Sequence, residues 1–246
     1  MSKTLAITLI IGALLLISSC STAKPDLKIL TENYPPLSYA EDGVATGFGS
    51  DVVNAIQADL GIDYPIEVQS WDEAYATALN EANVVLFTMD KTPKREESFY
   101  FIGPLGSNVA SFYANSEQLV QLQDIDEAKS CKAIGTTTNW FTEQYLLEQG
   151  FENLASKGDP LETLRMLANK EVDLAVFTDV TLPELCREAN IGIETLSPVL
   201  ELLSTDYYIA ISKASDAKVV EDWQKAFARL QESGKLEELR TKWFAE

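Results

Sequence analysis

The sequence predicts an α/β fold built as two lobes that are joined by two crossing strands. The first observation is that short apolar runs of strand length alternate with amphipathic stretches of helical period along the chain. The second is that a new set of such segments begins after residues 109–113, which gives a second lobe. The third is that a strand-like run at residues 207–212 and two amphipathic helices end the chain. We assign this ending to the first lobe, so that two strands cross between the lobes.

The first lobe contains five expected elements before the crossing. Residues 71–82 are the best-supported helix, because Ser70 and Glu73 have the spacing of a capping box. The remaining elements depend on apolar periodicity alone. They are strands at 27–30, 66–68 and 84–87 and a helix at 51–60.

The second lobe follows the same alternation. Residues 109–113 form the outgoing crossing strand and residues 207–212 the returning one. Between them we expect strands at 132–134 and 173–177 and helices at 139–149, 161–169 and 182–189. The two closing helices have apolar faces that contain Trp223, Phe227 and Leu230, and then Leu236, Leu239 and Trp243.

The amino terminus has the composition of a secretory signal. An apolar run at residues 5–17 has 13 residues, which is short of the roughly 20 needed to span a bilayer. The run ends in Ile17-Ser18-Ser19-Cys20, which resembles the bacterial lipoprotein box. The resemblance implies removal of residues 1–19, acylation of Cys20 and a lipidated tether at 20–26, and two or more acyl chains make a stable membrane anchor. The alternative is a soluble exported protein cleaved near Ala23.

The composition excludes several classes of function. The chain has 38 Asp and Glu against 19 Lys and Arg, a formal charge of -19, so its field repels nucleic acid. It has no histidine, which excludes Ser-His-Asp hydrolases and metal sites built on imidazole. Its three cysteines are too dispersed for a zinc ribbon or an iron–sulfur site. We therefore expect no nucleic-acid partner, no metal and no cofactor.

Five short motifs follow one another along the chain. They are Asn-Tyr-Pro-Pro-Leu at 33–37, Gly-Phe-Gly-Ser-Asp at 47–51, Thr-Pro-Lys-Arg-Glu at 92–96, Gly-Thr-Thr at 135–137 and Gly-Lys-Leu at 234–236. With these motifs the chain resembles, over residues 27–244, the bacterial extracellular solute-binding proteins of family 3, which bind polar amino acids for ABC transporters. The resemblance implies the type II fold of periplasmic binding proteins. It divides the chain into a first lobe at 27–114, a second lobe at 115–204 and a return segment of the first lobe at 205–246.

Arg95 is the leading candidate for contact with a ligand. Thr92 and Pro93 look like an N-cap and the first helical residue, which places Arg95 in a first helical turn, where a cation opposes the helix dipole. One interpretation is a solvated arginine balanced by Glu96 and Glu97. The other is a planar fork for a ligand carboxylate, which suits arginine better than lysine. The family resemblance implies the second, with Arg95 binding the α-carboxylate of an amino acid.

The resemblance adds three more first-lobe candidates. Thr88 and Asp90 stand seven and five residues before Arg95, where family members usually have small hydroxyl residues. Asp90 departs from that pattern, and an acid so close to Arg95 could neutralise it. Tyr34, in a turn stiffened by two prolines, matches the aromatic residue that covers the ligand, with ordinary packing as its alternative. Trp71 repeats with apolar residues at helical spacing, so we expect it in the core.

Three second-lobe residues complete the expected site. Thr137 lies where a strand passes into a helix and backbone N–H groups point at an anion, and the resemblance implies that it helps bind the carboxylate. Trp140 follows this loop, and we weigh two roles for it equally, stacking on a ligand and packing in the core. Asp179 follows a strand at the carboxyl edge of the sheet, where open α/β sheets bind ligands. The resemblance implies that Asp179 binds the ligand ammonium. Counting along the strand from Asp173 also allows Thr178 to hold this position.

Cys131 and Cys186 are expected to form a disulfide within the second lobe. Export places them in an oxidising compartment, and lipidation of Cys20 leaves them as an even pair. Two separate buried thiols are the alternative.

Together these features predict a lipid-anchored solute-binding protein on the periplasmic side of the bacterial cell envelope. Its lobes close on a small zwitterion or carboxylate, which it delivers as a monomer to the permease of an ABC-type importer without catalysing a reaction. One alternative is a ligand-presenting sensor component. The other, on the same fold, is an enzyme similar to cyclohexadienyl dehydratases, in which cleft carboxylates such as Asp90 assist loss of water and carbon dioxide.

Overall fold

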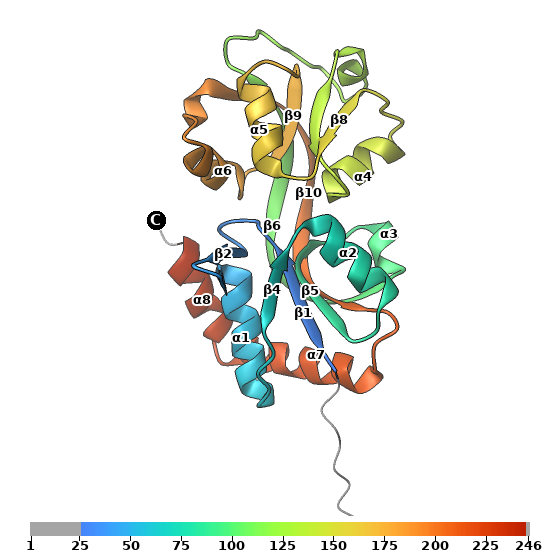
Figure 1. Cartoon of the computed structure of the whole chain (residues 1–246), viewed down its shortest axis with the longest axis vertical. Helices are drawn as coiled ribbons and strands as arrows, with labels where there is room; N and C mark the ends of the chain where they lie inside the picture. Colours follow the sequence, from blue (N-terminus) through green and yellow to red (C-terminus); the bar gives the residue numbers. More distant parts are fainter. Residues whose placement is uncertain (1–25, 245–246) are drawn as a thin grey trace, which may run out of the picture.

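The computed structural model describes residues 26–244, which form two α/β lobes stacked along the long axis of the molecule (Figure 1). Two long antiparallel strands, β6 (Phe99–Asn115) and β10 (Leu196–Ser212), run through both lobes and join them. This is the predicted α/β architecture with two crossing strands. The expected signal sequence, Cys20 and the tether up to residue 25 lie outside the described residues.

The lower lobe in Figure 1 contains both the first and the last described elements. Its sheet strands are β1 (Lys28–Glu32), β4 (Ile66–Gln69) and β5 (Val84–Asp90), and β2 (Tyr39–Glu41) and β3 (Val44–Thr46) form a small hairpin. Its helices are α1 (Phe48–Leu60), α2 (Trp71–Asn80), α3 (Pro93–Glu96), α7 (Ala217–Glu232) and α8 (Lys235–Phe244).

The upper lobe repeats the α/β pattern with shorter elements. Its strands are β7 (Ile134–Thr137), β8 (Leu154–Lys157) and β9 (Leu174–Thr178). Its helices are α4 (Phe141–Glu148), α5 (Pro160–Ala168) and α6 (Leu182–Ala189), with short 3-10 helices at Asp126–Ser130 and Ile193–Thr195. None of the helices between residues 26 and 244 is long and apolar enough to cross a membrane.

One eight-stranded sheet extends through both lobes, in the order β4-β1-β5-β10-β6-β9-β7-β8. β5 pairs with one end of β10 and β9 with the opposite end of β6, so the crossing strands connect two smaller sheets. β1 runs parallel to β5 in the lower lobe, and β7 runs parallel to β9 in the upper lobe. The carboxyl ends of these strands meet at the waist between the lobes, which is where open α/β sheets bind ligands.

Most of the predicted elements are confirmed within a few residues, but the crossing strands are longer than predicted. Each of them has 17 residues. The additional part of β6 contains Gly103, Pro104 and Gly106, which are residue types that normally interrupt strands and that hide this strand in the sequence. The hairpin and β8 are absent from the prediction, because their residues are exposed or half-buried and contain no apolar run that marks a strand.

The predicted disulfide between Cys131 and Cys186 is wrong, because both cysteines are free thiols. Two apolar clusters fill the upper lobe, one containing Leu174 and Val176 of β9 and the other containing the residues that alternate with them. Cys131 packs against the first cluster and Cys186 belongs to the second. Successive side chains of a strand point to opposite faces, so the sheet lies between the two thiols, whereas a disulfide needs Cα atoms about 4.4–6.8 Å apart.

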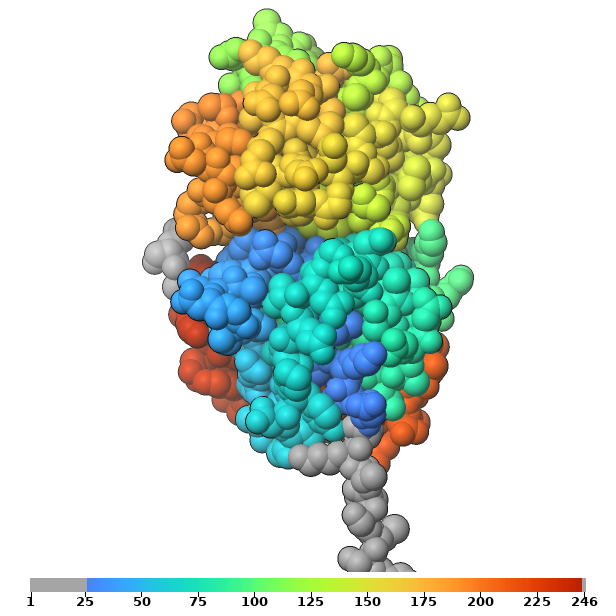
Figure 2. Space-filling model, viewed as in Figure 1, coloured from blue at the N-terminus to red at the C-terminus, as the bar shows by residue number. Residues whose placement is uncertain are grey.

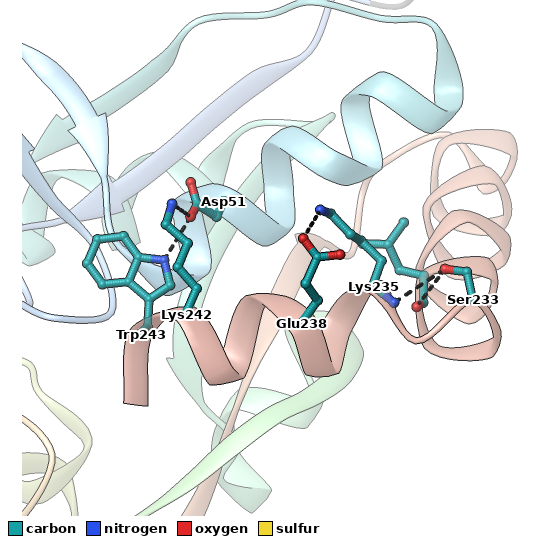
Figure 3. A network of polar contacts seen from close by, with 7 residues as sticks. Asp51, Ser233, Lys235, Glu238, Lys242 and Trp243 are labelled. Atoms are coloured by element: carbon teal, nitrogen blue, oxygen red, sulfur yellow. Dashed lines mark hydrogen bonds and ion pairs between the residues drawn. The ribbon is translucent and has the colours of Figure 1, made fainter. Parts of the chain in front are cut away.

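The last helix, α8, docks onto α1 of the lower lobe, as Figure 3 shows. Lys242 Nζ and Trp243 Nε1 both donate to Asp51 Oδ2, each at 2.7 Å. Lys235 pairs with Glu238 one turn along α8, also at 2.7 Å (Figure 3). The end of the described chain therefore packs on the lobe in which it begins.

Candidate ligand-binding site

The two lobes are in contact at the waist, as Figure 2 shows. A small cavity lined by buried residues of both lobes lies there. Its volume is about 10 Å³, which is room for about one water molecule. It is lined by Glu32, Tyr34, Trp71, Thr88, Asp90 and Arg95 from the lower lobe and by Trp140 and Phe141 from the upper lobe. Five of the residues predicted to contact a ligand, namely Tyr34, Thr88, Asp90, Arg95 and Trp140, therefore surround one cavity.

Arg95 is positioned by the start of α3. Thr92 Oγ1 accepts a hydrogen bond from the backbone N–H of Arg95 at 3.3 Å, and Pro93 follows the cap, as the sequence predicts. The Arg95 side chain points inward and is only 1% exposed. Its guanidinium lies 4.9 Å from the ring centroid of Trp71 and 5.3 Å from that of Tyr75. Both contacts are within the range of cation–π attraction.

The guanidinium of Arg95 has no carboxylate partner among residues 26–244. Nη1 donates to the backbone carbonyl of Asp90 at 3.0 Å and Nη2 to that of Asn139 at 3.2 Å, while Nε has no hydrogen-bond partner in the described chain. Burial lowers the pKa of Arg95, and the nearby Asp90, Tyr75 and Glu32 partly oppose this effect. A buried cation that lacks an ion-pair partner is destabilising. The arrangement is therefore suited to receive an anion.

Two buried carboxyl groups flank Arg95 without forming an ion pair with it. Burial raises the pKa of Glu32 to about 8, against the hydrogen bond from Trp140 and the charge of Arg95, which lower it. Burial also raises the pKa of Asp90 to about 6, against the lowering effect of its hydrogen bonds. Each carboxyl group therefore binds a proton more readily than an exposed one.

Asp90 is held by the crossing strands and not by Arg95. Its Oδ1 accepts from Asn108 Nδ2 at 2.7 Å and from Thr205 Oγ1 at 2.6 Å. Asn108 and Thr205 are partners in the pairing of β6 with β10. The carboxyl group of Asp90 is thus tied to the strands that join the lobes and does not pair with the guanidinium of Arg95.

Tyr34 and Thr88 complete the lower wall of the cavity. Tyr34 Oη and Thr178 Oγ1 lie 3.0 Å apart and link the two lobes. Thr88 has a φ of 62°, which is rare for a β-branched residue, and backbone strain of this kind clusters at functional sites. A Cβ added at Gly49 would lie 2.7 Å from Thr88 Cγ2, so α1 can approach this wall only with a glycine there.

Asn139 and Trp140 reach into the site from the upper lobe. Trp140 is 4% exposed and belongs to the apolar cluster of the lower lobe, where its ring meets that of Tyr34 edge-on at a centroid distance of 5.1 Å. Its Nε1 donates to Glu32 Oε2 at 2.9 Å. The backbone carbonyl of Asn139 accepts from Arg95 Nη2 and also from Trp71 Nε1, the latter at 2.9 Å. The turn between β7 and α4 therefore makes hydrogen bonds and a ring contact with the lower lobe.

The structure places the two remaining predicted contacts outside the cavity. Thr137 is buried at the end of β7, and its Oγ1 has no hydrogen-bond partner within the described residues. Asp179 is exposed, and its Oδ1 accepts from the backbone N–H of Val109 at 2.9 Å, on the crossing strand β6. Thr178 is the residue that faces Tyr34. Of the two alternatives for this position, Thr178 therefore contacts the lower lobe and Asp179 contacts the crossing strand, and which of them binds a ligand stays a prediction.

Three residues of the cavity wall are missing from the predicted contacts. Glu32 ends β1, two residues beyond the predicted end of that strand, and its position at a carboxyl edge is the signal that points to it. Trp71 is buried as predicted, but it also lines the cavity and stacks on Tyr75 with centroids 5.4 Å apart. Phe141 directly follows Trp140 at the start of α4.

A larger open pocket of about 480 Å³ adjoins the cavity and shares Glu32 and Trp71 with it. Its wall contains two further acids, Asp159 and Glu188, both from the upper lobe, and its lining includes no Lys or Arg. A ligand group that extends outward from the cavity therefore meets a negatively charged wall.

Sequence comparison relates the chain to a protein family and to a curated relative. Residues 27–246 match the family described as bacterial extracellular solute-binding proteins, family 3. The arginine-binding extracellular protein ArtP of Bacillus subtilis (strain 168) is 24% identical over 223 residues, which cover 86% of this chain and 83% of that protein.

Solved structures share the fold. A histidine kinase sensor domain with similarity to periplasmic binding proteins matches with a TM-score of 0.80 and 21% identity, covering 89% of this chain and 96% of that one. The arginine-, lysine-, histidine-binding protein ArtJ from Geobacillus stearothermophilus matches with a TM-score of 0.75 and 20% identity, covering 89% and 96%. The fold is that of the type II periplasmic binding proteins, as the sequence predicts. With a family match over nearly all of its described length, the chain belongs to the bacterial extracellular solute-binding proteins of family 3.

Proposed function

We propose that the protein binds an amino acid between its lobes, with the ligand α-carboxylate on Arg95, and delivers it to an ABC-type importer. The observation that carries this proposal is the buried guanidinium of Arg95, which has no carboxylate partner among residues 26–244 and an unpaired Nε. A guanidinium fork binds a carboxylate through two parallel hydrogen bonds, and such charge-assisted bonds are the strong ones.

The acidic surroundings favour a ligand with a cationic side chain. Glu32 borders both the cavity and the larger pocket, and the outer wall of that pocket adds Asp159 and Glu188. Two relatives are named for binding arginine, and one of them also for lysine and histidine. A basic amino acid would place its carboxylate on Arg95 and direct its side-chain cation toward Glu32, where the cation would favour release of the proton that burial holds on this carboxyl group.

The remaining contacts follow from the same placement. Thr88 and the backbone of Asp90 offer hydrogen bonds beside Arg95, Tyr34 and Trp71 cover the ligand, and Thr137 and Thr178 contribute from the upper lobe. Residues 27–114 and 205–246 move as one lobe and residues 115–204 as the other. The movement occurs about β6 and β10, a hinge closure of the kind that excludes water from a bound ligand.

Calorimetry with three matched ligands tests this proposal. L-Arginine is expected to bind, and at 100 times its Kd to raise the free energy of unfolding by about 2.7 kcal/mol. Agmatine lacks the carboxylate and L-citrulline lacks the cation, so each is expected to bind at least about tenfold more weakly, because each loses a charge-assisted hydrogen bond. If agmatine binds as tightly as L-arginine, the role of Arg95 is contradicted. If L-citrulline binds as tightly as L-arginine, the preference for a cation is contradicted.

We also propose that Cys20 is acylated and anchors the protein on the periplasmic side of a membrane. The lipoprotein-like box supports this proposal. Cys20→Ala is expected to move the protein from the membrane fraction to the soluble extract or to leave the signal sequence uncleaved, since acylation supplies the anchoring energy. Fractionation followed by immunoblotting measures this. A variant that is processed normally and stays with the membrane fraction contradicts the anchor.

A further inference from the structure

The contacts that a ligand would make in this site are already made by the protein itself. Asn139 and Trp140, which we call the bridging pair, reach from the upper lobe to the binding groups of the lower lobe. The carbonyl oxygen of Asn139 accepts from Arg95 Nη2 at 3.2 Å and from Trp71 Nε1 at 2.9 Å. The indole N–H of Trp140 donates to Glu32 Oε2 at 2.9 Å.

The chemistry of the bridging pair matches that of the ligand proposed above. A carbonyl oxygen on the guanidinium of Arg95 stands where a ligand carboxylate would stand. An N–H donor on Glu32 stands where a ligand cation would stand. The space left over is about 10 Å³, whereas small-molecule sites have volumes of about 300–1,000 Å³. The ligand and the bridging pair therefore cannot occupy the closed site together.

The bridging pair is held firmly by its own lobe. Asn139 has a φ of 58°, in the left-handed region that asparagine tolerates better than most residues, and its backbone N–H donates to Glu143 Oε2 at 2.6 Å. The backbone N–H of Trp140 donates to the carbonyl of Thr137 at 3.1 Å. The Asn139 side chain also bonds to Asp72 of the lower lobe. This turn is therefore a preformed element of the upper lobe that fits into the lower one.

We propose that Asn139 and Trp140 act as an internal substitute for the ligand, which closes the lobes in its absence and which the ligand must displace. The second half of this inference depends on the proposed amino-acid site, whereas the closure of the ligand-free protein does not. A ligand that needs the open form binds with an apparent Kd equal to its intrinsic Kd divided by the open fraction. The bridging pair therefore weakens binding to the extent that it keeps the lobes closed.

Small-angle scattering of the ligand-free protein tests the closure. The wild-type protein is expected to have the compact radius of gyration of the closed form, and Trp140→Ala a larger radius, because the variant loses both the ring in the lower-lobe core and the bond to Glu32. Trp243→Ala is the matched control, since Trp243 packs within the lower lobe against Tyr39 and Asp51 and is expected to leave the radius unchanged. Trp140→Phe keeps a ring and loses the N–H donor, and it is expected to open the lobes less than alanine does.

Equal ligand-free radii for wild type and for both Trp140 variants would overturn the closure. Addition of L-arginine then tests the displacement by calorimetry. Trp140→Ala is expected to bind L-arginine about tenfold more tightly than wild type if nine-tenths of the wild-type protein is closed. Affinity that is unchanged or weaker in this variant would overturn the displacement. Failure of L-arginine to bind either protein would contradict the proposed basic ligand, while the radii would still decide the closure.

Discussion

Replacing Arg95 with alanine is expected to abolish detectable binding of L-arginine. In wild type the ligand carboxylate would pair with a guanidinium that is 1% exposed. Removing one partner of such a buried pair costs about 3–5 kcal/mol, because the other charge is left without compensation. This corresponds to a Kd that is weaker by about two to four orders of magnitude. Titration calorimetry with L-arginine measures the change.

The stability of ligand-free Arg95→Ala is expected to change far less than its affinity. The variant loses the contacts of the guanidinium with the rings of Trp71 and Tyr75. It also loses a buried charge that has no carboxylate partner among residues 26–244, and this offsets part of the loss. We expect a melting temperature within a few degrees of wild type, which shows that weaker binding is not due to unfolding.

Two further variants separate charge from geometry in this experiment. Arg95→Lys keeps the positive charge but loses the planar fork, so it is expected to bind L-arginine more weakly than wild type and more tightly than alanine. Arg187→Ala is the matched surface control, because Arg187 is exposed and pairs with its neighbour Glu184 within α6. Its affinity is expected to equal that of wild type. Wild-type affinity in a folded Arg95→Ala would show that Arg95 does not bind the carboxylate.

Local signals in the sequence predict local features of the site correctly. The Thr92 cap and Pro93 that place Arg95 are present, as is the cap of α2 by Ser70. These features depend on residues within one helical turn, so a few neighbouring residues are enough to predict them. The order of strands and helices is also a local property and is mostly confirmed.

Contacts between the lobes could not be predicted in the same way. Trp140 belongs to the upper lobe, and its place in the core of the lower lobe depends on how far the lobes close. Glu32 becomes visible as a site residue only when its strand is known to extend to the waist. Both properties involve residues more than 100 positions apart, as the bond between Trp140 and Glu32 shows.

A difference of one residue in the end of a strand decides where the side chains of Thr178 and Asp179 lie. The predicted strand ends at residue 177, whereas β9 ends at Thr178, so Asp179 is the first residue beyond it. Neighbouring side chains at the end of a strand point in opposite directions. Thr178 therefore faces Tyr34, and Asp179 bonds to the backbone of Val109. The same alternation separates the two cysteines of the upper lobe.

The free energy of unfolding is expected to fall as the pH rises toward 8, and Glu32 is expected to supply much of the fall. Burial raises the pKa of Glu32 from 4.5 to about 8 in the folded protein. Between these values the folded state holds a proton that the unfolded state has released, so raising the pH favours the unfolded state by up to about 1.4 kcal/mol per pH unit. The charged groups that face Glu32 are Arg95 and Asp90, and the neutral Tyr34 and Trp140 also contact this region.

Asp90 contributes a similar fall of the free energy of unfolding at lower pH, because burial raises its pKa from 3.8 to about 6. Glu32 therefore contributes most of the fall between pH 6 and pH 8, and the comparison of wild type with Glu32→Gln removes the remaining contribution of Asp90. Glu32→Gln has no titrating carboxyl but keeps an oxygen that can accept from Trp140 Nε1. Between pH 6 and pH 8 the free energy of unfolding of wild type is therefore expected to fall by about 2–3 kcal/mol more than that of Glu32→Gln.

Urea denaturation of both proteins at pH 6 and pH 8 measures this difference, and the comparison cancels the repulsion that the acidic chain as a whole contributes. Glu152→Gln removes an exposed carboxyl in the loop after α4 and is the matched surface control. Asp90→Asn is expected to reduce the fall of the free energy of unfolding below pH 6 and to leave the fall between pH 6 and pH 8 in place. Equal slopes for wild type and Glu32→Gln between pH 6 and pH 8 would show that Glu32 is not buried as a protonated acid. In that case the carboxyl group would be hydrated, and the lobes of the ligand-free protein would be open at the waist.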